Sequence, residues 1–265
     1  MNFTKIGLVT FGLLGLFGLL ADGGLDKLLH ATTDNFFEVL APYLISLAIL
    51  CMGFIIKGNT ALPKEKSAPP IRSISWGYKT AWYAIKSPAD PSEVAKILGV
   101  KELKEVSWPV GVGISYGPPE QCGIFVSNAV EGWTFAVGMA LANEHTENLI
   151  GTYESNLIAL SEKFGEAQFF ATHRVVDMHI WARAVAGKLT RSYFYVGEQG
   201  EVFRNLGEPT PAEVSFTFLT KPMDKWDKFP DEEDVLSIAS SWSINPVTFE
   251  DKKESLESAK GLLGT

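Results

Sequence analysis

The sequence predicts an α+β protein, with an N-terminal transmembrane helical hairpin followed by a single domain of mainly antiparallel sheet and flanking helices. Two observations support this prediction. Residues 6–56 are mostly apolar with few charges, whereas the rest of the 265-residue chain has the composition of a soluble protein. In that second part, predicted strands follow one another in groups with few strand–helix–strand alternations, which favours an antiparallel sheet over a doubly wound fold.

Two apolar runs form the predicted hairpin, at about residues 6–21 and 37–56. A membrane-spanning helix needs about 20 apolar residues, with about 17 as the lower limit. A signal peptide is the alternative for the first run, because Lys5 supplies a positively charged start. Leu19, however, places a large residue where a cleavage site prefers a small one. The second run also follows closely, so the hairpin is favoured and the signal peptide stays open.

Basic residues set the expected orientation in the membrane. Residues 57–73 are rich in proline and lysine, lack an apolar period and are predicted to be a linker. Basic residues concentrate on the cytoplasmic side of a membrane protein. Those after the second run are Lys57, Lys64, Lys66 and Arg72. We therefore expect an inner (plasma) membrane protein whose soluble domain faces the cytoplasm.

Charge and cysteine content narrow the possible partners. The net charge is −8 and the isoelectric point about 5.1, which argues against nucleic acid, because phosphate binding needs clustered lysine and arginine. The two cysteines are Cys51, in the second apolar run, and Cys122, in the domain. No disulfide within the domain is possible, which fits a reducing compartment.

Hydrophobic periods and Gly/Pro punctuation define the expected elements of the domain, residues 74–247. Asp90 is a predicted helix N-cap, with Pro91 at the first helical position. The elements that follow are strands at 110–116, 123–126 and 133–141, a helix at 148–164 that Gly165 ends, and strands at 175–184, 188–196 and 201–204.

The last part of the chain carries two helix-start signals. Thr210-Pro211-Ala212-Glu213 has the form of a helix start. Asp231-Glu232-Glu233 places acidic residues at the start of a second helix, which the helix dipole favours, and that helix is expected to extend to Ala239 or Trp242. Residues 248–265 are predicted to form a charged tail, helical at 252–263.

One polar row carries the candidate catalytic residues. On a continuous strand, Asp177 and His179 lie on one face about 7 Å apart, and a carboxylate at this spacing can orient an imidazole or raise its pKa. His173 would lie about 20 Å away on a straight strand, which excludes joint metal binding unless the chain bends near Arg174. No metal or cofactor is predicted.

Two other interpretations of this row stay open. It is either a polar sheet face packed under another element, or a binding face made of His173, Arg174, Trp181 and Arg183. Elsewhere, the sequence lacks nucleotide-binding, zinc-hydrolase and nucleophile-elbow motifs. Gly111-Val112-Gly113 is interpreted as a bulge in the first strand, and the seven tryptophans indicate a large aromatic core.

Several short motifs resemble those of a group of uncharacterised bacterial proteins over about residues 76–247. The motifs are Gly132-Trp133-Thr134, Phe164-Gly165-Glu166, Thr172-His173-Arg174-Val175-Val176, His179-x-Trp181-Ala182-Arg183-Ala184, Gly197-Glu198-x-Gly200-Glu201, and the stretch from Pro230-Asp231-Glu232-Glu233 to Trp242-Ser243-Ile244-Asn245-Pro246. The resemblance implies no activity and no catalytic residues.

Three functions are consistent with these features. The favoured one is a membrane-anchored, non-catalytic domain that binds a protein partner, in one form an immunity protein that neutralises an antibacterial toxin. The second is an enzyme that uses Asp177 and His179 on a small substrate. The third is an assembly factor of a membrane complex. The sequence fixes neither the partner nor the oligomeric state.

Overall fold

The structure is a computed structural model that describes residues 72–86, 88–116, 123–198, 200–216 and 229–265. These residues belong to one compact unit, Pro69–Thr265. The expected hairpin, most of the linker and both cysteines lie outside the described residues. Among the residues that are described, no helix has the length and hydrophobicity needed to cross a bilayer.

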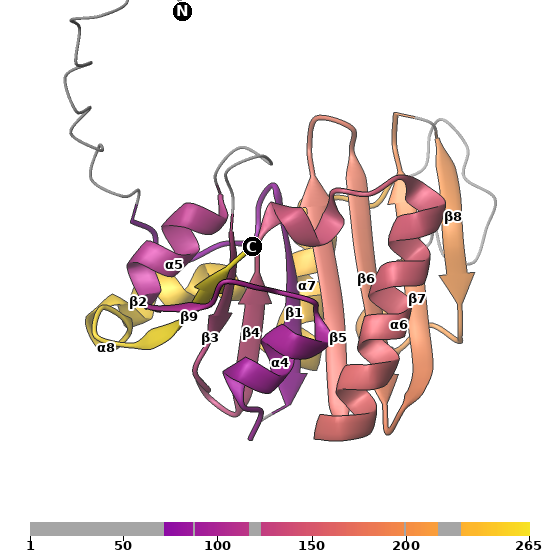
Figure 1. The fold of residues 1–265 in the computed structure, drawn as a ribbon. Coiled ribbons are helices and arrows are strands. Elements are labelled where there is room, and N and C mark those ends of the chain that lie inside the picture. Colours follow the sequence, from indigo (N-terminus) through magenta and orange to yellow (C-terminus); the bar gives the residue numbers. More distant parts are fainter. Residues whose placement is uncertain (1–71, 87, 117–122, 199, 217–228) are drawn as a thin grey trace, which may run out of the picture. The chain divides into compact units, whose positions relative to one another are not determined.

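Within the described residues, nine strands form one sheet in the order β2-β9-β3-β4-β1-β5-β6-β7-β8 (Figure 1). Every neighbouring pair is antiparallel, which confirms the predicted α+β class with a mainly antiparallel sheet. The strands are β1 (Thr80–Lys86), β2 (Lys104–Ser107), β3 (Ile124–Ser127), β4 (Trp133–Val137), β5 (Glu166–His173), β6 (Met178–Val185), β7 (Lys188–Val196), β8 (Glu201–Leu206) and β9 (Lys260–Gly264).

Helices flank the sheet on both faces. On the face that we call the α6 face, α4 (Pro91–Ile97) and α6 (Thr146–Phe164) pack on mostly small and aliphatic strand residues. The opposite face, the α7 face, buries an aromatic core that includes Trp82, Trp108 and Trp181. Its covering elements are α5 (Trp108–Ser115), α7 (Glu232–Trp242), α8 (Lys253–Leu256) and the 3₁₀ helix η4 (Pro246–Lys252). Figure 1 shows α4 and α6 in front of the sheet and α7 behind it.

Local signals placed the two longest helices correctly. Helix α6 ends at Gly165, whose φ of 90° is a left-handed conformation that favours glycine. Helix α7 begins with a capping box, in which the side chains of Asp231 and Asp234 each accept a hydrogen bond from the other residue's backbone amide. Both predicted helices are confirmed.

The predicted strand at 110–116 is wrong, because these residues form most of α5. Pro109 lies in the first turn of the helix, where a missing amide hydrogen costs nothing. Gly111 lies against Phe125 of β3, and a Cβ at this position would be 2.1 Å from the Phe125 ring. The glycine therefore permits close packing of the helix on β3, and the expected bulge is not present at Gly111.

The predicted helix at 252–263 is also wrong in its second half. Residues 260–264 form β9, which inserts between β2 and β3. A Cβ on Gly261 would lie 2.4 Å from the carbonyl oxygen of Val126, so this strand needs glycine to approach its neighbour. The last residues of the chain, expected to be a charged tail, thus complete the sheet.

Replacing Gly111 by alanine should lower the free energy of unfolding by about 1–3 kcal/mol, because the new Cβ would overlap Phe125. Gly151 in α6 is the matched control, since nothing lies within 4 Å of its Cβ position. Alanine there should raise the free energy of unfolding by roughly 0.5–1 kcal/mol. Chemical denaturation of both variants measures the difference. Equal effects would contradict the close packing of α5 on β3.

Candidate functional site

The row of candidate residues does not lie on one continuous strand, so the predicted strand at 175–184 is corrected at its start. Strand β5 ends at His173, residues 174–177 form a turn, and β6 begins at Met178. Asp177 in this turn has a φ of 52°. The chain therefore bends near Arg174, and His173 pairs with Met178 across the hairpin instead of lying far along a strand.

Asp177 and His179 make direct contact. Asp177 Oδ1 and His179 Nε2 are 2.8 Å apart. The Asp177 side chain is 53% exposed, whereas that of His179 is 1% exposed and stacks against Tyr195. Burial, with the Asp177 carboxylate nearby, raises the pKa of Tyr195. The contact therefore links the exposed turn to an imidazole that is enclosed in the sheet.

The two histidines do not share a site. Directly paired residues of neighbouring strands point to the same face. His173 pairs with Met178 and belongs to the α6 face, while His179 pairs with Thr172 and belongs to the α7 face. The described part of the chain holds no group of three or more His, Cys, Asp or Glu side chains that could bind a metal ion.

Trp181 and Arg183 are held by contacts within the domain. Trp181 is fully buried, stacks on Tyr193 and donates through Nε1 to Glu213 at 2.7 Å. Arg183 is half-buried and donates through Nε to Glu166 at 2.8 Å. These two candidate binding residues therefore stabilise the α7 face, where a partner cannot reach the Trp181 ring.

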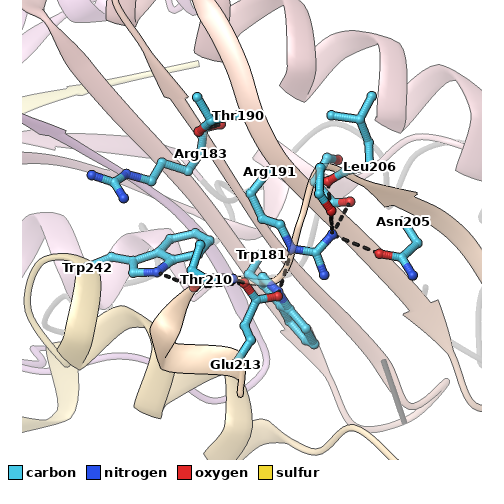
Figure 2. Close-up of polar contacts among 11 residues, drawn as sticks. Trp181, Arg183, Thr190, Arg191, Asn205, Leu206, Thr210, Glu213 and Trp242 are labelled. Atoms are coloured by element: carbon cyan, nitrogen blue, oxygen red, sulfur yellow. Dashed lines mark hydrogen bonds and ion pairs between the residues drawn. The ribbon is translucent and has the colours of Figure 1, made fainter. Parts of the chain in front are cut away.

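The dominant polar feature of the α7 face is a buried ion pair that the sequence did not predict (Figure 2). Arg191 Nε lies 2.8 Å from Glu213 Oε1, and both side chains are 0% exposed. Arg191 is on β7, while Glu213 is in the 3₁₀ helix η2 (Pro211–Glu213). The helix-start signal at Thr210–Glu213 was correct. The sequence did not identify Arg191 as the partner of Glu213, because the two residues are 22 positions apart along the chain.

Each charge of the pair has further hydrogen bonds. Glu213 also accepts bonds from the backbone amide and the hydroxyl of Thr210, both at 2.8 Å. Arg191 Nη1 donates to Asn205 Oδ1 at 2.8 Å and to the Leu206 carbonyl at 2.9 Å. A buried charge needs such satisfaction to offset its desolvation. The network therefore pins the segment after β8 onto the sheet.

Arg174 differs from the other candidates, because its side chain is 62% exposed. Its Nη2 lies 3.0 Å from the Glu232 carboxylate, at the start of α7. Its guanidinium lies over the ring of Tyr78, with 5.8 Å between the guanidinium carbon and the ring centroid. Tyr78 donates its hydroxyl to Glu233 at 2.8 Å. The contacts thus join the start of β1, the β5–β6 turn and α7.

We call this group the Tyr78 surface, defined by Tyr78, Arg174, Val175, Glu232 and Glu233. Val175 follows Arg174 in the turn and is 71% exposed. The hydrogen bond to Glu233, followed by partial burial and the acidic charges nearby, raises the pKa of Tyr78. The surface combines exposed apolar and aromatic side chains with acidic ones. The sequence pointed to Arg174 but gave no signal for Tyr78 or Val175.

Comparison with known proteins gives no match: no protein-family model, no curated protein and no solved structure is similar to this chain.

Replacing Glu213 by glutamine should lower the free energy of unfolding by about 3–5 kcal/mol, because it leaves the Arg191 charge buried without a counter-ion. Combining Glu213→Gln with Arg191→Met should cost less than the sum of the two single changes. A double-mutant cycle by chemical denaturation measures this coupling. The more exposed pair Arg204–Glu154 serves as a control and should contribute about 1 kcal/mol or less. Additive costs at Arg191 and Glu213 would contradict the interpretation.

Replacing Glu233 by glutamine should lower the pKa of Tyr78, because the carboxylate is the main cause of its increase. Titration of tyrosines labelled at the ring carbon that bears the hydroxyl measures the change by NMR. Tyr195 is the internal control and should not shift. Since folding raises the pKa of Tyr78, this contact stabilises the fold fully below about pH 10, the usual tyrosine value. That stabilisation is lost as the pH rises through the folded-state pKa. An unchanged Tyr78 pKa would contradict the hydrogen bond.

Proposed function

We propose that this protein is a non-catalytic binding module, held at the cytoplasmic face of the inner membrane by its N-terminal residues, that binds a protein partner through the Tyr78 surface. The observation that supports the proposal is the exposed Val175 in a fixed turn beside Tyr78 and Arg174. Tyrosine and arginine are enriched among the residues that dominate interface energies.

The Tyr78 surface is also preorganised. Tyr78 and Arg174 are each bound to a carboxylate of α7. The turn is fixed from the other side by the β7–β8 turn, where Gly197 donates its amide to the Asp177 carbonyl at 2.9 Å. Side chains that are already ordered lose less conformational entropy when a partner binds. The ordered side chains therefore support the proposal that this surface binds a partner.

The charge of the domain indicates the kind of partner. Residues 1–71 contain five basic and five acidic side chains, so the whole net charge of −8 belongs to residues 72–265. Such a surface attracts a basic partner and repels nucleic acid. Immunity against a basic antibacterial toxin is a specific form of this proposal.

An enzyme that uses Asp177 and His179 receives less support. The two residues do form the expected contact, but the imidazole is enclosed between Asp177 and the α7 face. A role in the assembly of a membrane complex stays compatible with the same surface. Stable co-purification with several membrane subunits in mild detergent would favour assembly over a single partner.

Changing Val175 to aspartate should reduce partner capture at least tenfold, since it replaces the exposed apolar side chain of the proposed interface by a charge. Each 1.4 kcal/mol of lost affinity is a factor of ten. Tyr78→Ala should act in the same direction. The experiment captures partners of the tagged full-length chain in mild detergent and quantifies each of them by mass spectrometry.

Ile158→Asp is the matched control, because Ile158 is an exposed apolar residue of α6 on the opposite face of the sheet. A protein that is retained equally by Val175→Asp and by Ile158→Asp is not bound through the Tyr78 surface. If all captured proteins behave in this way, the proposal fails.

A further inference from the structure

A hollow lies beside the Tyr78 surface. It has a volume of about 390 Å³ and is lined mainly by Trp76, Tyr78, Gly113, Tyr116 and Val247, with Arg72 at its edge. These residues come from the segment before β1, the C-terminal end of α5 and η4. Tyr78 belongs both to the hollow and to the Tyr78 surface, so the two are continuous.

Most polar groups around the hollow are already bound within the domain. The Tyr78 hydroxyl donates to Glu233, and the Tyr116 hydroxyl lies near the backbone of Gly77. The hydroxyl of Ser73 donates to the Ser75 carbonyl, and that of Ser75 to Glu250. Trp76 Nε1 has no hydrogen-bond partner within the described residues, but that atom is itself buried. Apart from the Arg72 side chain, what remains available is mainly the apolar surface of Tyr78, Tyr116 and Val247. The hollow therefore suits an apolar group better than a polar metabolite.

Two acidic side chains flank the hollow. Glu233 and Glu250 are exposed, and neither forms an ion pair with any residue in the described part of the chain. Each is placed by a hydroxyl of a lining residue, Glu233 by Tyr78 and Glu250 by Ser75 at 3.3 Å. Arg72, the basic residue of the lining, also lines a second hollow with Glu250, Lys253 and Glu257, and Arg174 lies over the Tyr78 ring. The rim therefore carries charges of both signs, and Glu233 and Glu250 are carboxylates in it that form no ion pair within the described residues.

We propose that this hollow is the anchor pocket of the binding surface, and that it receives one aromatic or aliphatic side chain of the partner next to a lysine or arginine. The basic neighbour pairs with Glu233 or Glu250. The inference rests on the proposed function and adds the partner's local chemistry to it. The volume lies near the lower end of the range of about 300–1,000 Å³ that is typical of ligand pockets, so it suits one bulky side chain rather than a large cofactor.

The test uses a defined probe, a nine-residue peptide with a central benzoylphenylalanine flanked on each side by two lysines. The full-length chain in mild detergent is irradiated with this peptide, and the attachment sites are mapped by mass spectrometry. We expect attachment at Tyr116 and Val247. A non-reactive peptide with central phenylalanine and the same lysines should compete. Peptides with central serine, or with glutamates in place of the lysines, should compete poorly.

Two double variants test whether attachment depends on the carboxylates of Glu233 and Glu250. Glu233→Gln combined with Glu250→Gln should reduce attachment about fivefold, because two exposed ion pairs are lost. Glu147→Gln combined with Glu162→Gln removes the same charge from exposed positions of α6, on the other face of the sheet, and should leave attachment unchanged. Thermal melts of both double variants confirm that they are folded.

Three outcomes would overturn the inference. Attachment spread over the whole surface, or equal competition by lysine and glutamate peptides, would show that the hollow is no specific pocket. Attachment that appears only after Lys64 and Lys66 are changed to glutamine would show that the chain's own linker is the occupant. If the hollow fails while partner capture still depends on Val175, the inference fails and the proposed function stands. If capture is also insensitive to Val175, both fail.

Discussion

The buried ion pair between Arg191 and Glu213 is the interaction on which the α7 face depends. Taking two charges out of water costs several kcal/mol for each. The surrounding hydrogen bonds offset much of that cost through Arg191 Nε and Nη1, while Nη2 has no partner within the described residues. The pair is linked through Thr210 to Trp242, the last residue of α7, whose Nε1 donates to the Thr210 hydroxyl at 3.1 Å. The C-terminal end of the helix is thereby joined to the ion pair, and Gln168 of β5 also donates to the Trp242 carbonyl at 3.0 Å.

The opposite end of α7 is fixed by different contacts, and these face solvent. Glu232 and Glu233 bind Arg174 and Tyr78, so one helix connects the buried network to the exposed surface. A helix held at both ends presents its first turn in one orientation, and the side chains bound to that turn inherit this order. The buried polar residues hold the elements together, while Tyr78 and Val175 stay exposed. The proposed binding role rests on this division.

Local sequence patterns predicted the elements that local forces decide. Strand β7 has the predicted bounds, and α6 and α7 begin and end near their capping residues. The failures share a different cause. The stretch around Gly111 is a helix that packs closely on Phe125, a residue of another element, and β9 is a strand that pairs with β2 and β3. Both contacts are made with segments that lie elsewhere in the chain. The Arg191–Glu213 pair and the Tyr78 surface likewise join distant segments, so no pattern along the chain could reveal them.

The Asp177–His179 contact shows that a pattern with a chemical interpretation can also have a structural role. An acid two residues before a histidine suggested catalysis, yet the buried imidazole binds an exposed carboxylate whose backbone has a left-handed φ of 52°. Such a conformation is costly for a residue other than glycine and persists only where surrounding contacts enforce it. Here the enforcing contacts are His179 and the Gly197 amide. Their effect is to hold the turn in one conformation, with Val175 in solvent and Arg174 over Tyr78. The pair thus positions the turn, and the burial of the imidazole keeps this contact in place.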